Sequence, residues 1–242
     1  FSANPPIAIF SPARRVRNNT TKHTLENVLE NKEVVINVVS HAMVQQTSLS
    51  STEYGKDVNE FTKSGFTPIA SETIKPFRVQ ESPVQLECVV NNVISLGDEG
   101  GAGNLVICEV KLIHIDESIF DKNGKIDPNK IDLVGRMGAN WYCRSSNDAI
   151  FEVKKPLTTL GIGIDQIPNN IRNSTILSGN DLGKLGNVER IPNMEEVQKF
   201  RVAKNLNNEN SIILHQKAKE LLNQGNTIDA WKILLIDKLN RV

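Results

Sequence analysis

The chain has 242 residues, with 28 Lys or Arg balanced by 28 Asp or Glu, so its formal net charge is zero. This balance argues against nucleic acid or an anionic membrane as a partner, and an aromatic content of 5% is low for stacking on single strands. No apolar run approaches the ~20 residues of a membrane-spanning helix. Three cysteines without CxxC spacing (Cys88, Cys108 and Cys143) favour buried thiols in a reduced cytoplasm.

The first predicted element is a strand. The opening stretch, FSANPPIAIFSP, has neither an initial Met nor signal-peptide character, and its residues 5–11 have the composition of a strand. Because the chain enters this strand at once, we expect earlier strands of the same domain to be missing from the sequence.

A short helix follows at about 21–31, in the stretch NNTTKHTLENVLEN. Its apolar spacing predicts one buried face, and Thr21 or Thr24 can serve as its N-cap. The first turn also holds Lys22 and His23, although the backbone there already carries partial positive charge. A bound phosphate, held by free amides, the threonine hydroxyls and the lysine, would explain this charge. The alternative is that Lys22 simply extends into water.

The middle of the chain predicts antiparallel sheet. The β-branched run EVVINVVS at 33–40 predicts a buried strand, and the polar stretch 41–65 predicts helix or loop with a short helix at VNEFTKSG. Two alternating runs joined by GDEGGAG predict a hairpin, as in a meander or barrel. The apolar positions expected on one face are Val84, Leu86, Cys88, Val90, Ile94 and Leu96, with Val106, Cys108, Val110 and Leu112 opposite them.

After Val153 the composition changes. Residues 154–192 are rich in Gly, Pro and Asn and predict surface loop with short helical turns, whereas the chain from Asn193 predicts helices. The last 33 residues or so have the pattern of a helical hairpin, which we expect to form a cap packed on the main body. The predicted domains are therefore 1–153 and 154–242.

Several motifs are better explained as structure than as chemistry. GDEGGAG joins two strands instead of opening a helix, so it predicts a turn and not a phosphate loop. DKNGKID at 121–127 lacks the glycine and glutamate positions of a calcium loop and predicts an Asn-Gly turn. His114 lies among predicted strand residues, and we expect it to be a hydrogen-bonded residue of the sheet wall and not a metal ligand. We find no metal-ligand spacing, no acid–base pair and no serine-hydrolase elbow, so neither a metal nor a catalytic side chain is predicted.

Six segments, in order, resemble the flavin reductase family: SANPPIAIFSP, TKHTLENVLENKEVVINVVS, VNEFTKSGFTP, ESPVQLECVV, GAGNLVICEV with IHID, and LVGRMGANWYCR. This is the FMN-binding split-barrel group that includes flavoredoxin and the reductase components of two-component monooxygenases. The resemblance spans about residues 1–150. It implies a mainly β fold, an antiparallel Greek-key split barrel with short helices, followed by a loop-rich and then helical C-terminal extension. It also implies a homodimer with a flavin groove near the interface.

The resemblance also implies site residues. Lys22-His23-Thr24 matches the family's Lys-Asp-Thr segment, which holds the flavin phosphate, with His23 departing from the pattern. Ser2 and Ser11 match positions that line the flavin, and Ser50 matches the loop that closes over the flavin or its adenine end. Arg136 and Tyr142 match the nicotinamide side. Residues preceding Phe1 would supply backbone contacts to the flavin ring.

The resemblance implies an NAD(P)H-dependent flavin reductase, in which a hydride passes from the nicotinamide to bound FMN. FAD remains an alternative cofactor, and a monooxygenase or another electron acceptor is an alternative partner. Two other readings stay open: an FMN-binding electron-transfer protein without its own NAD(P)H reaction, and a dimeric scaffold that has lost flavin. The cofactor would supply the chemistry, which agrees with the lack of catalytic side chains in the sequence.

Overall fold

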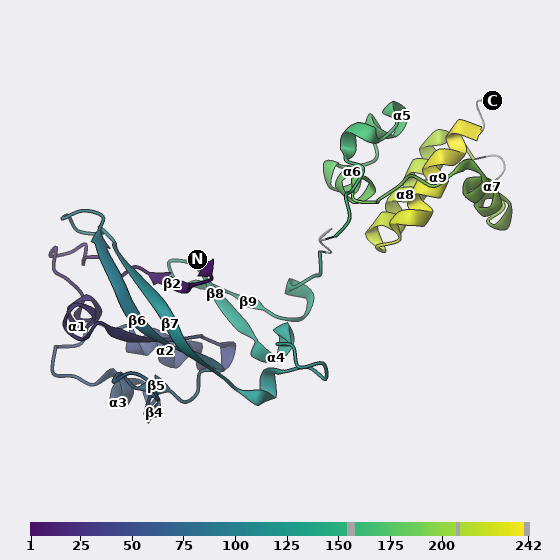
Figure 1. Cartoon of the computed structure of the whole chain (residues 1–242). Coiled ribbons are helices and arrows are strands. Elements are labelled where there is room, and N and C mark those ends of the chain that lie inside the picture. Colours follow the sequence, from purple (N-terminus) through teal and green to yellow (C-terminus); the bar gives the residue numbers. More distant parts are fainter. Residues whose placement is uncertain (154–157, 207–208, 240–242) are drawn as a thin grey trace. The chain divides into compact units, whose positions relative to one another are not determined.

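The computed structural model describes residues 1–153, 158–206 and 209–239. The chain divides into two compact units, Phe1–Phe151 and Glu152–Val242 (Figure 1). Each unit has its own hydrophobic cluster, and the two are described separately below.

The first unit is built on a five-stranded antiparallel sheet with the order β1-β2-β7-β6-β3. In the described residues its edge strands, β1 and β3, do not pair with each other, so the sheet stays open and no closed barrel forms. Two separate two-stranded sheets complete the unit. The strands are β1 (Ser2–Ala3), β2 (Pro6–Phe10), β3 (Glu33–Asn37), β4 (Pro68–Ile69), β5 (Arg78–Val79), β6 (Val84–Ser95), β7 (Asn104–Ile115), β8 (Leu133–Gly138) and β9 (Trp141–Ser145).

The predicted hairpin is formed by β6 and β7, but its pairing contains two irregularities. The register shifts between Glu87 and Cys88, where Lys111 of β7 has no partner, and shifts back beyond Val90, where Asn91 of β6 has none. An unpaired residue is the mark of a β-bulge, and it reverses the alternation of faces beyond it. The two bulges therefore compensate each other, and only three residue pairs between them are displaced.

These bulges explain three errors in the predicted face. Leu86, Cys88 and Val90 do belong to the core cluster, with Val106, Cys108 and Val110. Beyond the bulge at Asn91 the core position passes to Val93, and Ile94 and Leu96 are exposed. Beyond the bulge at Lys111, Leu112 pairs with Glu87, out of phase with the core positions. The predictions for Ile94, Leu96 and Leu112 were therefore wrong.

Helix α1 (His23–Asn31) packs Leu25 and Val28 inward, and Val28 joins the core cluster of the sheet. Leu29, also predicted on the buried face, is exposed. The N-cap is Lys22, with no side-chain cap, so neither Thr21 nor Thr24 fills that role. Thr21 instead donates from its hydroxyl to Glu26 at 2.8 Å.

The other helices of this unit are short. Residues 41–65 form helical turns as predicted, and the turn at Asp121 is closed by the Asp121 carboxylate, which accepts from the amides of Asn123 and Lys125. The helices are α2 (Val44–Ser50), α3 (Glu60–Ser64) and α4 (Pro128–Ile131), with 3-10 turns at η1 (His41–Met43), η2 (Glu117–Ile119) and η3 (Asn147–Ala149).

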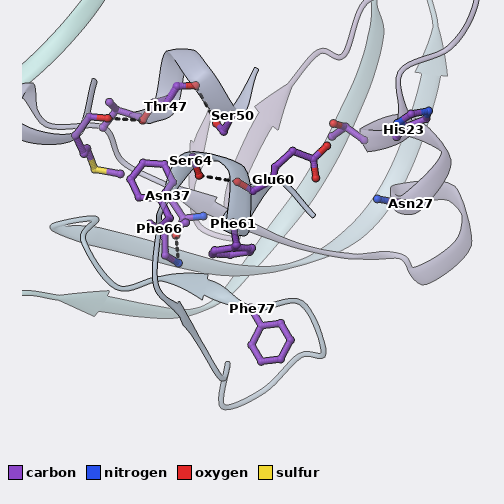
Figure 2. A pocket seen from close by; sticks show the side chains of 14 residues that line it. His23, Asn27, Asn37, Thr47, Ser50, Glu60, Phe61, Ser64, Phe66 and Phe77 are labelled. Atoms are coloured by element: carbon purple, nitrogen blue, oxygen red, sulfur yellow. Dashed lines mark hydrogen bonds between the residues drawn. The ribbon is translucent and has the colours of Figure 1, made fainter. Parts of the chain in front are cut away.

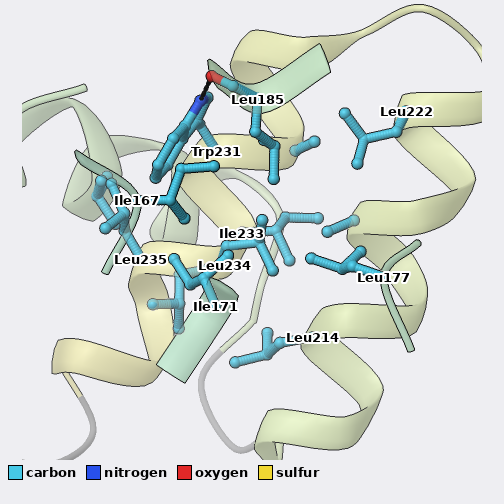
Figure 3. Close-up of a cluster of buried hydrophobic side chains, with 14 of the residues drawn as sticks. Ile167, Ile171, Leu177, Leu185, Leu214, Leu222, Trp231, Ile233, Leu234 and Leu235 are labelled. Atoms are coloured by element: carbon cyan, nitrogen blue, oxygen red, sulfur yellow. Dashed lines mark hydrogen bonds between the residues drawn. The ribbon is translucent and has the colours of Figure 1, made fainter. Parts of the chain in front are cut away.

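The second unit is helical in its described part. The predicted hairpin is confirmed as α8 (Ser211–Asn223) and α9 (Thr227–Leu239), and its apolar face contributes to a core within the same unit (Figure 3). Trp231 is fully buried there and donates from its indole N–H to the carbonyl of Leu185 at 3.0 Å. The preceding elements are η4 (Ile164–Gln166), α5 (Asn169–Arg172), α6 (Gly179–Gly186) and α7 (Met194–Ala203).

The stretch predicted as loop thus contains α6, which is closed by a capping box between Ser178 and Asp181. Helices make up a large share of the described chain in addition to the antiparallel sheet. The molecule is therefore a mixed helix and sheet protein, and the prediction of a mainly β chain was too narrow. Of the helices in the described ranges, none has the length and apolar character needed to cross a membrane.

Candidate functional site

The first unit contains a cavity of about 410 Å³ between the start of α1, the helices α2 and α3, and the strands β3 and β5 (Figure 2). This volume lies in the range of sites that hold small molecules. Polar and apolar side chains both line it. The lining residues are His23, Thr24, Asn27, Asn37, Val39, Met43, Thr47, Ser50, Glu60, Phe61, Ser64, Phe66, Phe77 and Val79.

One wall is the N-terminal turn of α1. The carbonyl of Lys22 accepts from the amides of Leu25 and Glu26, whereas the amides of His23 and Thr24 have no acceptor among the described residues. The side chains of these two residues line the cavity. Free amides and the positive end of the helix dipole together favour an anion at this wall.

The segment entering α1 is fixed by an arginine that sequence reasoning did not select. Arg15 donates to the backbone carbonyl of Thr21 and to the hydroxyl of Thr20, and its Nε lies 3.7 Å from a carboxylate oxygen of Glu53. Its side chain is largely buried. The start of the helix is therefore anchored before any ligand binds.

A second wall carries three hydroxyl groups that already donate hydrogen bonds to backbone carbonyls. Thr47 donates to the carbonyl of Met43, Ser50 to that of Thr47, and Ser64 to that of Glu60, at 2.6–3.0 Å. Each oxygen keeps lone pairs and can still accept. These hydroxyls therefore suit a ligand that brings donor groups of its own.

Two side-chain amides and one carboxylate complete the polar lining. The Asn37 oxygen accepts from the amide of Val79 at 3.0 Å, which leaves its NH₂ group without a described partner. The side-chain amide of Asn27 makes no described hydrogen bond. Glu60 is the acid of the lining and can accept from ligand hydroxyls. The cavity thus combines anion-binding amides, neutral donors and one negatively charged acceptor.

An adjoining cavity of about 620 Å³ continues along α1 toward β3. It shares Thr24, Asn27, Phe61 and Phe77 with the first cavity, so the two form one continuous groove. We call this the α1 groove, and the cavity of about 410 Å³ its inner part. The outer part is bordered by Asn31, Glu33, Val35, Lys75 and Pro76 among others.

The loop that carries Phe77 is held by a buried carboxylate. Glu87 is fully buried and accepts from the amides of Glu72 and Thr73 at 2.8 and 2.7 Å and from the Thr73 hydroxyl at 2.6 Å. Its other contacts are His114, at 2.7 Å, and Arg78, at 3.6 Å. Burial would raise the pKa of Glu87, but these hydrogen bonds outweigh it and lower the pKa to about 2. The predicted wall histidine, His114, is therefore confirmed as a hydrogen-bonded residue.

A separate cavity of about 550 Å³ lies between α2 and the β8–β9 sheet. Arg136 and Tyr142 line it, with the guanidinium carbon 5.9 Å from the centre of the tyrosine ring. Arg136 also donates to the carbonyl of Ala139 at 3.0 Å. Arg144 forms two hydrogen bonds of 2.7 Å with Asp132, which lower the pKa of that carboxyl. The second cavity therefore contains two arginines, of which Arg136 has no carboxylate partner among the described residues.

The structure separates the predicted site residues into three groups. His23, Thr24 and Ser50 line the inner part of the α1 groove, and Arg136 and Tyr142 line the second cavity. Helix α2 contributes to both cavities. The predicted residues that line neither are Ser2, Ser11 and Lys22.

Each residue of the last group has a definite place. Lys22 is exposed at the N-cap of α1, beside the groove. Ser2 lies on β1 at the edge of the sheet, and Ser11 follows β2. A Cβ atom at Gly103 would lie 2.6 Å from the Ser11 hydroxyl, so a larger residue there would require this hydroxyl to move.

Sequence reasoning missed Asn27, Glu60, Phe77 and Glu87. Asn27 had a usable signal, because it lies one turn after His23 on the same predicted helix and so on the same side. The others had none, since their positions depend on long-range packing and on the bulges of β6 and β7. Among the described residues, no group of three or more His, Cys, Asp or Glu side chains is arranged to hold a metal ion.

Comparison with known proteins gives a consistent family. The family model described as flavin reductase like domain matches residues 1–129. An uncharacterized protein from Aquifex aeolicus is 31% identical over 149 residues, which cover 62% of this chain and 74% of that protein.

Two solved structures are similar to the first unit. Nitrilotriacetate monooxygenase component B from Bacillus cereus has a TM-score of 0.57 and 26% identity, over 63% of this chain and 74% of that chain. A protein assigned as a flavin reductase with a split-barrel domain, from Shewanella frigidimarina, has a TM-score of 0.53 and 26% identity, over 64% of this chain and 74% of that one. The family and its split-barrel neighbours agree with the antiparallel sheet described above.

Proposed function

Because the chain belongs to the flavin reductase like family, we propose that it binds FMN and passes a hydride from NAD(P)H to it. The observation that carries this proposal is the α1 groove, where free helix amides, neutral donors and aromatic side chains meet in one cavity. These groups match the chemistry of a ligand with a phosphate, a hydroxylated chain and a planar ring.

The residues of the groove suit the parts of FMN. In this proposal the amides of His23 and Thr24, with the Thr24 hydroxyl, hold the phosphate, and Lys22 adds positive charge from outside the lining. Glu60 accepts from the ribityl hydroxyls. Apolar residues such as Phe66 and Met43 exclude water from the inner part. Bound flavin would supply the redox chemistry, and the protein would orient the reactants.

The second cavity is our candidate for the nicotinamide side. Arg136 lies over the ring of Tyr142 and has no carboxylate partner in the part of the chain that the structure describes, so it can attract a pyridine-nucleotide phosphate while the ring shapes the wall. We also propose that Ser2, on β1, and Ser11, just after β2, contact the flavin. Ser50 is kept at the inner end of the groove.

We also propose that the protein acts as a homodimer with an electron-accepting partner. The exposed side chains of Met137 and Trp141 on the β8–β9 sheet, with 69% and 75% of their surface accessible, suit burial against a second copy. A monooxygenase is one acceptor class, since a similar structure is a monooxygenase component B. All three cysteines are free thiols, which suits our expectation of a cytoplasmic protein. Cys88 and Cys108 are buried as expected, whereas Cys143 is exposed, so the expectation of a buried thiol was wrong there.

The test is to load the purified protein with FMN and mix it anaerobically with NADH or NADPH in a stopped-flow instrument. We expect the flavin absorbance band to bleach with at least one nucleotide. Loss of bleaching in Arg136→Ala, with FMN still bound, would support the nicotinamide side of the proposal.

Two other outcomes point elsewhere. FMN binding without bleaching by either nucleotide would favour the electron-transfer alternative. A protein that takes up neither FMN nor FAD would contradict the whole proposal and favour a scaffold.

A further inference from the structure

The α1 groove is longer than its inner part, and two aromatic rings stand where its two parts meet. Phe61 and Phe77 line both cavities. Phe61 comes from α3, and Phe77 comes from the loop before β5 (Figure 2). Phe77 has 56% of its surface exposed, which is unusual for a phenylalanine in a loop with anchored ends.

The loop around Phe77 is held on both sides. Before it, the amide of Lys75 donates to Glu33 at 2.9 Å, and the amides of Glu72 and Thr73 donate to the buried Glu87. After it, Arg78 donates to Gln85 at 2.8 Å and to the carbonyl of Ala70. The exposed ring is thus presented from a fixed backbone, as a preorganised binding surface requires.

The groove beyond this ring combines polar and apolar side chains. Asn31, Glu33 and Lys75 line the outer part, together with Val34 and Val35. Amide and charged groups beside a flat apolar face are the features that bind the base of a nucleotide, because the ring stacks and its edge forms hydrogen bonds. One flavin mononucleotide would use the helix amides and the inner part, leaving this outer part for a second ring.

We propose that Phe77 is the stacking platform for the adenine ring of a dinucleotide, bound in the outer part of the α1 groove. This inference rests on the proposed function, since it assumes that the inner part holds the flavin. The adenine can come from two sources: it belongs to the cofactor if FAD is bound, or to NAD(P)H if FMN is bound. Lys75 lies beside it and can contact the pyrophosphate.

The experiment measures binding and not turnover. Dissociation constants for FMN and FAD are determined by flavin fluorescence titration for the wild type, Phe77→Leu and Phe77→Tyr. The same variants, loaded with FMN that is first reduced with dithionite under anaerobic conditions so that no hydride transfer follows, are titrated with NADH and with nicotinamide mononucleotide in its reduced form, which lacks adenine. Phe151→Leu, on an exposed phenylalanine of the same unit that lines none of these cavities, serves as the control.

We expect Phe77→Leu to weaken the adenine-containing ligand on the order of tenfold, because leucine keeps the apolar surface but removes the ring. Phe77→Tyr should restore most of the affinity, and FMN should bind within about twofold of wild type in all variants. Loss confined to FAD identifies the cofactor as the source, and loss confined to NADH identifies the nucleotide substrate.

Two results would overturn the inference. One is unchanged FAD and NADH binding in Phe77→Leu while FMN binds normally. The other is equal weakening of FMN and FAD, which would place the flavin ring itself on Phe77. A wild-type protein that binds no flavin would instead contradict the proposed function.

Discussion

Lys22 occupies the N-cap of α1, where a residue with a short side-chain acceptor would ordinarily stabilise the helix. A lysine there supplies no acceptor and adds positive charge to a backbone that is already positive. Its exposed side chain lies beside the α1 groove and not in its lining. Lys22 therefore does not cap the helix through its side chain, and under the proposed function its charge attracts the flavin phosphate.

We expect Lys22→Glu to weaken FMN binding more than tenfold, because it replaces an attractive charge with a repulsive one next to the helix amides. Riboflavin, which has no phosphate, should lose much less. Fluorescence titration with both ligands measures the difference. Lys122→Glu, in an exposed turn, makes the same change in net charge and should leave FMN binding unaltered. Equal effects of the two substitutions would remove Lys22 from the site.

The chemistry at single positions was only partly predictable. His23 and Thr24 were predicted from the resemblance to the flavin reductase family at a helix start that the local sequence indicates, and the structure places both in the lining of the α1 groove. Phe77 was not predicted, because its exposure depends on a loop held by Glu87, which accepts from loop amides 14 and 15 positions earlier in the chain. Local patterns do not carry that information.

At the scale of elements, the alternation of the long hairpin predicted β6 and β7 but not the exact faces of their ends. Glu87 occupies a position that simple alternation assigns to solvent, yet it is fully buried. The bulge at Lys111 places Leu112 and His114 on the same face as Glu87 and Gln85. A bulge changes which side a residue faces without changing the composition of the strand, so the sequence pattern conceals it.

The Glu87 carboxylate should make the stability of the first unit depend on pH. Its pKa falls from 4.5 in the unfolded chain to about 2 in the folded one, so its contribution is fully present above pH 4.5 and is lost as the pH falls toward 2. We expect Glu87→Gln to lower the free energy of unfolding on the order of 2 kcal/mol at pH 7, and by much less near pH 2.5.

Urea denaturation at the two pH values, followed by circular dichroism, measures this difference. Glu30→Gln, on the exposed side of α1, is the matched control and should have little effect at either pH. A loss of the same size at both pH values would show that shape, and not charge, accounts for the role of Glu87.

At the scale of the whole molecule, the chain provides one spectroscopic probe for each unit. Trp231 is fully buried in the second unit, whereas Trp141 is exposed in the first. The hairpin of α8 and α9 completes a core with α6 and the segment around Ile167 and Ile171, so the apolar face that we expected to cap the main body is filled within its own unit. The change in composition near residue 153 did not reveal that the apolar partners of this hairpin lie in its own unit.

We expect thermal unfolding of Trp141→Phe, followed by tryptophan fluorescence, to report the second unit alone. Leu234→Ala removes a fully buried side chain there and should destabilise that transition by about 2–5 kcal/mol. Flavin binding, which reports the first unit, should be unchanged. If flavin affinity and the Trp231 transition fell together, the two units would be energetically coupled.

The paired bulges of β6 and β7 also bear on how this hairpin can change length. Asn91 and Lys111 are extra residues on opposite strands, and neither has a partner across the ladder. Deleting either one would remove its bulge while the pairs on both sides, and the faces of Glu87 and Val93, stay as they are. Deleting a paired residue instead would reverse the faces of the strand beyond it, so evolution or protein engineering can shorten this ribbon safely at these two positions.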